Sequence, residues 1–527
     1  MTAGFPTLGE VVKYSFRATG IIPSKYEHAH SLSDKEKKKY QKALERLAAE
    51  EGNINKSFQE LGDVFIKILS ASIKNRKVLQ VISDVIGDLV LVYGNVITDD
   101  GTYQDRKGSL RWILSSYFIP RLVVSLHKHP ARINLASEAL ISPTEPYWFL
   151  PTIDDNSVTW PLGKAMTWVY QLSGVNQTQF HYPSEEAKSN DHLKANQLDS
   201  AQNWLTGKHI PSWEALQRNF TQALEAYPHL AEQKESILLT LFVARVATII
   251  SQDIDELYGR DYLNKLHAQF KRHTDWLKGP METLSRFFDE MAHHPQIPSE
   301  MLDSIHADYT ERFWLERADI MVDAANHIQS IIMEAPHNLS AEQQVWFLSH
   351  YGEDVVGPIF DFFDRQQEQR KHIPEGFIEC LAEFLELKKT NCEPSDVDRF
   401  IAKLESYQLS SVCAWMVPWL RAETLFHAND WPGIYRELSS AFDAAKYAAG
   451  QNQRPLLNHY LEACAKNNKW REFKKGVAWA QYLGIKVRFL GQDEPSDDNM
   501  RYVFGLMRNG YIAWEGLTGC QLGSLDL

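Results

Sequence analysis

Helical periodicity is the feature that most limits how this chain can fold. Along most of the 527 residues, apolar side chains recur at helical spacing, and strict two-residue alternation is almost absent. Helical spacing places apolar side chains on one side of a helix, whereas alternation is what a half-buried strand requires. The pattern therefore predicts an all-α protein with several helical domains.

Breaks in this periodicity divide the chain. The clearest covers residues 140–163, which contain four prolines, a glycine and paired aspartates. A chain of this length commonly holds three or four domains. We expect an N-terminal helical domain over 1–140, a linker and helix-turn-helix-like segment over 141–230, a central helical domain over 231–395, and helical repeats with a tail over 396–527.

A polar helix is expected over residues 34–51. Ser33 and Glu36 have the Ser-x-x-Glu spacing of a capping box, in which two side chains satisfy backbone N–H groups at a helix start. The four lysines between positions 35 and 39 form the most basic cluster in the chain, but glutamates lie among and after them. We interpret this cluster as a solvated helix face rather than an anion site.

Charge and cysteine content narrow the classes of function. The chain carries 55 Lys and Arg against 68 Asp and Glu, a net charge of −13, which disfavours a protein dedicated to binding nucleic acid. Its five cysteines include no Cys-x-x-Cys pair, so neither a disulfide framework nor a zinc ribbon is expected. The first residues show neither the basic nor the apolar segment of a signal peptide. We therefore expect reduced thiols and a cytoplasmic location.

Two stretches are apolar enough to be compared with membrane spans. Residues 64–93 contain six charged side chains, and residues 237–250 contain Arg245 after a few apolar turns. A span requires about 20 predominantly apolar residues. We therefore expect a soluble chain with no membrane partner.

An internal repeat lies late in the chain. Asn-Asp-Trp-Pro-Gly-Ile at 429–434 aligns with Asn-Lys-Trp-Arg-Glu-Phe at 468–473, an offset of 39 residues, and the same offset aligns Ala441 with Ala480. An amphipathic helix is expected before and after each tryptophan. Residues 411–484 therefore resemble tetratricopeptide-type helix-hairpin repeats. The resemblance implies an α-solenoid whose concave face binds protein.

A second resemblance covers residues 198–216. A tryptophan, a glycine three residues later, a basic residue and a Pro-Ser turn precede a further helix, through Trp204, Gly207 and Pro211 to the apolar anchor Leu216. This order is similar to the latter half of a Cro/repressor-type helix-turn-helix domain. The resemblance implies a recognition helix that ends near Trp204.

The same resemblance assigns DNA contacts. Ser200, Gln202 and Asn203 would point outward from the recognition helix, where Gln and Asn can pair with adenine, and Lys208 could neutralise a phosphate. The family's preceding helix should occupy residues 180–197, which contain few apolar residues and no glycine. Packing, or contact with protein, is therefore the favoured interpretation of this segment, and DNA binding is the alternative.

Signatures of catalysis and of metal binding are thin. Glu290 and His293 have the Glu-x-x-His spacing of di-iron bundles, but a convincing second motif is absent. The chain contains no phosphate-binding Gly-rich loop and no Gly-x-Ser-x-Gly elbow. Glu316 and Arg317 are expected on an ion-paired helix face. We predict no catalytic residues, no cofactor and no metal, and enzymatic activity is disfavoured.

These observations favour a non-catalytic cytoplasmic interaction or regulatory protein that binds another protein through its helical repeats. Binding would bury partner surface in a preformed groove, with charged residues at its rim providing selectivity. The repeat aromatics Trp431, Tyr435, Trp470 and Phe473 are expected to pack between helices. The alternatives are a DNA-binding transcriptional regulator that uses the helix-turn-helix-like segment, and an enzyme with a helical active site that lacks a recognisable motif.

Overall fold

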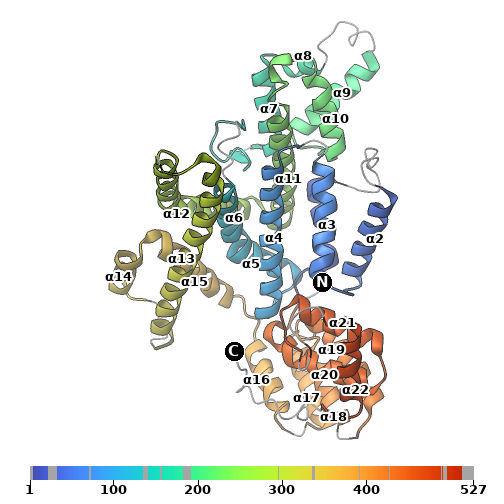
Figure 1. The fold of residues 1–527 in the computed structure, drawn as a ribbon. Coiled ribbons are helices and arrows are strands. Elements are labelled where there is room, and N and C mark those ends of the chain that lie inside the picture. Colours follow the sequence, from blue (N-terminus) through green and yellow to red (C-terminus); the bar gives the residue numbers. More distant parts are fainter. Residues whose placement is uncertain are drawn as a thin grey trace.

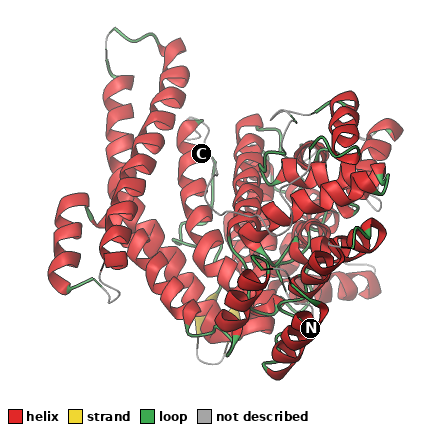
Figure 2. Cartoon of the chain, turned by 90° about the horizontal axis from the view of Figure 1, so that it is seen from below, coloured by secondary structure: helices red, strands yellow, loops and turns green. Residues whose placement is uncertain are grey.

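The computed structural model describes residues 4–21, 33–70, 73–133, 140–154, 157–181, 191–294, 296–334, 339–390, 392–426, 428–487, 490 and 495–512. In these residues helices predominate, and the two strands are three residues long each (Figure 2). The strands β1 (Thr152–Asp154) and β2 (Ser157–Thr159) pair antiparallel, with Thr152 opposite Thr159. The prediction of an all-α fold is confirmed.

The N-terminal helices form one side of a central column (Figure 1). At the start of α2, Ser33 Oγ accepts the Glu36 N–H at 3.3 Å and the Glu36 carboxylate accepts the Ser33 N–H at 2.7 Å, so the predicted capping box is present. α4 and α6 pack against each other. The elements are α1 (Leu8–Thr19), α2 (Asp34–Ala48), α3 (Ile54–Leu69), α4 (Arg76–Asp99), α5 (Arg106–Ile113), the π-helix η2 (Leu114–Phe118) and α6 (Ile119–Arg132).

At the end of the column opposite the C-terminal helices lie α7 (Pro161–Ser173), α8 (Gln177–His181), α9 (Asp191–Leu205) and α10 (Trp213–Leu224), and the 3-10 turn η5 (Pro228–Leu230) leads from them into α11 (Lys234–Tyr258) (Figure 1). The buried Arg245 on α11 joins three segments, because its Nε donates to the Pro211 carbonyl at 2.7 Å and its Nη1 donates to the Ala18 carbonyl. Burial lowers the pKa of Arg245 to about 10, which still leaves the guanidinium charged at neutral pH.

Four helices project from the column as an arm (Figure 1). They are α12 (Arg260–Ala292), α13 (Ser299–Glu334), α14 (Ala341–Tyr351) and α15 (Glu353–Arg370). α12 and α13 both pack on α6, and α15 lies against α12, α13 and α14. The arm has a small core of its own around Phe347 and Val356, and a second core around Phe270 and Trp314 that it shares with Val123 of α6.

The remaining helices form a bundle at the other end of the column (Figure 1). They are α16 (Phe377–Leu387), α17 (Pro394–Ser406), α18 (Met416–Phe426), α19 (Trp431–Ala445), the 3-10 turn η6 (Gly450–Asn452), α20 (Gln453–Lys466), α21 (Trp470–Tyr482) and α22 (Asp497–Arg508). From α18 to α21 each helix packs on the next. Asn429 and Asn468, at the 39-residue offset, have φ values of 55° and 57°, so the same left-handed turn precedes both α19 and α21.

The C-terminal bundle is docked onto the N-terminal residues. The Phe5 N–H donates to the Tyr447 carbonyl at 2.7 Å, and the Thr102 N–H donates to the Ala448 carbonyl at 2.9 Å. Lys446 forms an ion pair with Glu50. One continuous core accordingly includes buried residues from both ends of the described chain.

Two segments satisfy the length and composition of a membrane span, namely α4 and Pro228–Tyr258, which contains α11. α11 packs against α1, α7, α10 and α12 in the column. Buried core helices of soluble proteins have the same length and composition, so neither criterion distinguishes a span from a core helix.

Candidate functional site

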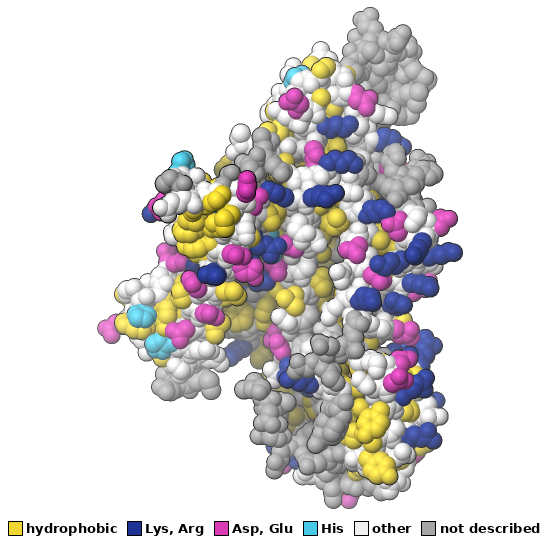
Figure 3. All heavy atoms as spheres, viewed as in Figure 1, with side chains coloured by type: hydrophobic (Ala, Val, Ile, Leu, Met, Phe, Trp, Pro, Cys, Tyr) yellow, Lys and Arg dark blue, Asp and Glu magenta, His cyan; other side chains and the backbone are white. Residues whose placement is uncertain are grey.

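The arm exposes an unusual amount of apolar surface. Fifteen large apolar side chains are exposed among the described residues, and seven of them lie on α13 and α14: Met301, Leu315, Ile320, Val322, Val345, Trp346 and Leu348. Figure 3 shows apolar side chains gathered on this part of the molecule. Single exposed apolar side chains are ordinary, but a concentration on two neighbouring helices is typical of a docking surface.

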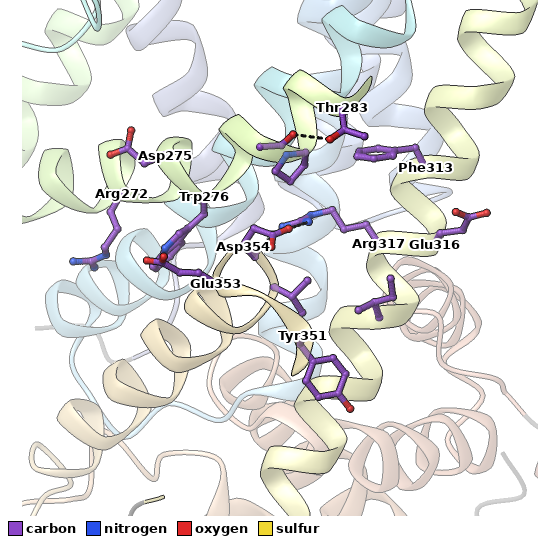
Figure 4. A pocket seen from close by; sticks show the side chains of 14 residues that line it. Arg272, Asp275, Trp276, Thr283, Phe313, Glu316, Arg317, Tyr351, Glu353 and Asp354 are labelled. Carbon is purple, nitrogen blue, oxygen red and sulfur yellow. Dashed lines mark hydrogen bonds and ion pairs between the residues drawn. The ribbon is translucent and has the colours of Figure 1, made fainter. Parts of the chain in front are cut away.

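A groove of about 860 Å³ runs through the arm, between α12 and α13 and over the start of α15. Its apolar lining comes from Trp276 and Pro280 on α12, Phe313 and Ile320 on α13, and Tyr351 at the end of α14. Figure 4 shows these walls facing one another across an open space. The groove is thus preformed by helices that are held in place elsewhere in the arm.

One ion pair crosses the groove. Arg317 on α13 reaches toward Asp354 on α15 (Figure 4) and donates to its carboxylate and to its backbone carbonyl. Arg317 is ion-paired, as the sequence suggested, but it is only 9% exposed. Its partner comes from α15 and not from its own helix, and Asp354 covers it.

The lining of the groove is acidic overall. It contains four carboxylates and two guanidinium groups, contributed by Asp275, Glu316, Glu353 and Asp354 and by Arg272 and Arg317. Asp275 pairs with Lys278, and both arginines are paired. Glu316 and Glu353 form no ion pair with any described residue. These two carboxylates therefore leave negative charge at the rim.

Asp361 on α15 holds the α12 wall in position. Its carboxylate accepts hydrogen bonds from Gln269 Nε2 at 3.0 Å, His273 Nε2 at 3.2 Å and Arg365 Nε at 2.9 Å, and it pairs with Arg272. Burial alone would raise the pKa of Asp361, but the hydrogen bonds from His273 and Arg365 and the charge of Arg365 lower it well below its usual range. The carboxylate therefore stays ionised as the anchor of three helix-α12 side chains.

The position of Trp276 depends on a glycine. A Cβ atom at Gly357 of α15 would lie 2.6 Å from Trp276 Cε2, so only glycine allows the indole to lie against that helix. On its other side, Trp276 meets the His273 ring edge-to-face, with centroids 4.8 Å apart. The large aromatic wall of the groove is thus held in a fixed orientation.

The structure places the four residues predicted to contact DNA at the end of α9 and in the following turn. Gln202 and Lys208 are exposed, whereas Ser200 and Asn203 are partly buried. Gly163 allows α7 to approach α9 closely, since a Cβ there would lie 2.3 Å from the Leu205 carbonyl oxygen. Residues 182–190, part of the family's expected preceding helix, lie outside the described residues. DNA binding by this segment stays a prediction.

The structure also places the repeat aromatics and the Glu290–His293 pair. Phe473 is fully buried, and Trp431, Tyr435 and Trp470 pack partly buried against the main core, so the prediction that these aromatics lie between helices is confirmed. Glu290 and His293 lie exposed at the end of α12. Within the described residues, no cluster of three or more His, Cys, Asp or Glu could hold a metal ion.

No family model, curated protein or solved structure matches this chain. The groove, its aromatic walls and its unpaired carboxylates are therefore the features from which function can be inferred.

Sequence reasoning missed the groove. Trp276, Phe313 and Tyr351 lie far apart in the chain, and helical spacing alone cannot show that they face a common space. One signal was available, because Leu315, Ile320 and Val322 lie close together on α13 and cannot all belong to one buried side. Apolar residues around a helix that also carries many charges indicate an extra, unoccupied surface.

Proposed function

We propose that this protein is a non-catalytic interaction protein that binds a segment of another protein in the groove between α12, α13 and α15. The observation that carries the proposal is a preformed groove with aromatic and aliphatic walls and an acidic rim. Protein interfaces commonly combine an apolar centre with a polar edge. A cytoplasmic location and a regulatory role are part of the same proposal.

The proposed occupant is an amphipathic helix with basic residues on its polar side. Such a helix places apolar side chains at i, i+3, i+4 and i+7 into a groove of this kind. Trp276, Phe313 and Ile320 would receive that apolar face. Glu316 and Glu353 would attract the basic side chains, because complementary charge at a rim steers association and discriminates between partners.

The binding surface extends beyond the groove through aromatic contacts. Tyr351, which lines the groove, lies with its ring centroid 6.4 Å from that of Trp346 on α14. Trp346 is 46% exposed and stacks on His350 at 4.8 Å. Exposed tryptophans are frequent energetic centres of interfaces, so Trp346 is the proposed second contact point.

The repeat pattern favours partner binding by the helical repeats, but in this proposal the repeats have a supporting role. Part of the C-terminal bundle is already covered by the N-terminal segment, through Tyr447, Ala448 and Lys446. In this proposal the bundle supports the column and the arm binds the partner. Binding by the repeats, as a solenoid, is the alternative location of the same function.

Photo-crosslinking tests the proposal with a matched pair of positions. Ile320 in the groove and Leu257 on α11 are both 47% exposed, and only Ile320 lines the groove. A photo-crosslinking amino acid is placed at each position of the full chain and irradiated in extract of its native cells. We expect a discrete protein to be crosslinked from position 320 and absent from position 257.

Reversing the charge of the rim provides a second test of the same site. Glu316→Lys combined with Glu353→Lys should weaken binding of the crosslinked protein by about tenfold or more, because it removes both attractive carboxylates. The peptide crosslinked to position 320 should be basic and amphipathic. Equal crosslinking from both positions, or binding unaffected by the charge reversal, would refute the proposed site.

A further inference from the structure

A second cavity, of about 450 Å³, is lined by α5, the π-helix η2, α12 and α15, and also by Tyr103, His372, Pro374 and Val412. No described residue lines both this cavity and the groove. Asp361 connects their walls, since it pairs with Arg272 of the groove and accepts hydrogen bonds from Gln269 and Arg365 of the cavity.

The wall of this cavity contains the π-helix. In η2 the wider turn leaves backbone carbonyls available, and the Ser115 carbonyl accepts a hydrogen bond from Gln269 Nε2 at 2.7 Å. One turn earlier, the Arg111 carbonyl accepts from Tyr262 Oη at 2.6 Å. π-helical turns inside α-helices occur frequently at functional sites. Here the turn is fixed by side chains of α12 that also line the cavity.

Three side chains that line the cavity have unmet hydrogen-bonding capacity. Trp112, Ser116 and Gln269 are 7%, 4% and 1% exposed. Their Nε1, Oγ and Oε1 atoms, respectively, have no hydrogen-bond partner among the described residues. Buried polar atoms are normally paired, so three unpaired atoms on side chains of one lining give this cavity a wall with polar groups to spare. They offer a donor, a hydroxyl and an acceptor.

Two cations that form no ion pair with a described residue lie in the lining of the cavity. The Arg111 guanidinium lies over the Tyr262 ring, 4.7 Å from its centroid, and Lys265 is exposed one turn along α12. The third cation of the lining, Arg365, is paired with Asp361. The lining also holds two carboxylates, Glu368 and Asp105, and Asp105 caps α5 by accepting the Gly108 N–H at 2.8 Å.

We propose that this cavity binds a small planar molecule that bears an anionic group. The ring lies between the aromatic side chains of Tyr103, Trp112 and Tyr262, where stacking and edge contacts are favourable. The anion is held by Arg111 and Lys265 through charge-assisted hydrogen bonds. A cavity of this volume is within the range of small-molecule sites. The proposal is independent of the protein-binding groove.

Calorimetric titration of the full chain tests the proposal with four probes. Adenosine monophosphate and indole-3-acetate combine a planar ring with a phosphate or a carboxylate, adenosine supplies a ring alone, and inorganic phosphate supplies an anion alone. We expect saturable binding of at least one ring-bearing anion at a single site. Adenosine and inorganic phosphate should bind about tenfold more weakly or not at all, because each lacks one half of the recognition. The ring-bearing anion that binds distinguishes a phosphate from a carboxylate.

Variants locate that binding. Arg111→Ala and Lys265→Ala should each weaken it by about tenfold, the effect of losing one charge-assisted hydrogen bond. Trp112→Phe keeps an aromatic ring and removes the N–H donor together with part of the indole, and a smaller loss of about threefold is expected. Arg286→Ala removes an equally exposed cation from α12 outside the cavity and should leave binding unchanged.

Two results would overturn the proposal. One is the absence of saturable binding by either ring-bearing anion. The other is binding that Arg111→Ala and Lys265→Ala leave unaffected, or that Arg286→Ala weakens equally. Binding weakened by Glu316→Lys with Glu353→Lys and by neither cavity variant would place the ligand in the groove instead, which also refutes the cavity site.

Discussion

The C-terminal bundle and the arm differ in how much apolar surface they leave exposed. In the bundle most large aromatics are inside, and Trp419, Trp479 and Phe473 are fully buried, although Tyr502 on α22 is exposed. In the arm, seven large apolar side chains on α13 and α14 are exposed, among them Trp346. Both regions bury a charged group, Lys446 in the bundle and Arg317 in the arm, so the difference lies in the exposed apolar side chains.

This difference between bundle and arm indicates which of the two has apolar surface free to bind a partner. The bundle buries apolar surface within itself and against the N-terminal residues, where the Tyr447 carbonyl accepts from Phe5 and Gln453 Nε2 donates to the Ile97 carbonyl. The arm has no corresponding cover on α13 and α14 among the described residues. Exposed apolar surface in a stable protein generally corresponds to contact with a partner. The two regions should therefore respond differently to loss of an aromatic side chain.

The largest predicted effect compares two tryptophans. Trp479→Ala should lower the free energy of unfolding by about 4 kcal/mol, because it leaves a cavity in the bundle and removes the 3.1 Å hydrogen bond from Trp479 Nε1 to Gln453. Trp346→Ala should change it by less than about 1 kcal/mol. Urea unfolding followed by circular dichroism measures both. Similar losses in the two variants would show that Trp346 is a core residue and remove the contrast.

A second prediction concerns the charged interior of the arm. Asp361→Asn should destabilise the protein by about 3 kcal/mol, since Arg272 and Arg365 lose their common counter-ion. Asp364→Asn, at an exposed position of the same helix, is the control and should have little effect. Denaturant unfolding at neutral pH provides the measurement. Equal stability of the two variants would mean that Asp361 does not anchor the groove.

The lowered pKa of Asp361 also predicts how the stability difference between wild type and Asp361→Asn changes with pH. Because the folded protein lowers the pKa of Asp361, its stabilisation is fully present above the ordinary aspartate pKa of about 3.9. It is lost as the pH falls below that value. The stability difference between wild type and Asp361→Asn should therefore shrink on acidification, and a difference that grows would contradict the assignment.

The sequence could predict local structure better than the relation between helices. Ser33 and Glu36 identify a helix start, and the repeated Asn-x-Trp identifies two matching turns, because these signals act over a few residues. The pattern of α13 shows where Arg317 lies on its helix, but the carboxylate that buries it is 37 positions away. The groove and the cavity depend on such distant contacts, and a single sequence gives no information on them.

A smaller prediction concerns Glu423, a strongly perturbed carboxyl in the bundle. Burial raises the pKa of Glu423 to about 8, and the charge of Lys388 opposes this only in part. Between about pH 4.5 and about pH 8 the folded state retains a proton that the unfolded chain releases, so the free energy of unfolding falls as the pH rises. Glu423→Gln should remove about 1–2 kcal/mol of this decline.

Thermal unfolding of wild type and Glu423→Gln across this pH range checks the prediction. Glu405→Gln, at an exposed position of α17, is the control and should retain the wild-type slope. An unchanged slope in Glu423→Gln would show that this carboxyl is ionised in the folded protein. The bundle would then hold a buried carboxylate charge in addition to the buried Lys446 cation.

The smallest effect on stability is expected at the residue most important for the proposed binding. Ile320→Ser removes an apolar side chain that is exposed to solvent, so the free energy of unfolding should change by no more than about 0.5 kcal/mol. The same change should weaken partner binding by about tenfold, because that side chain is buried only in the complex. Leu257→Ser, equally exposed on α11, should affect neither quantity. A loss of stability at Ile320 matching the loss of binding would mean that the residue acts through folding of the arm. Binding lost without destabilisation would identify α13 as a surface kept apolar for a partner.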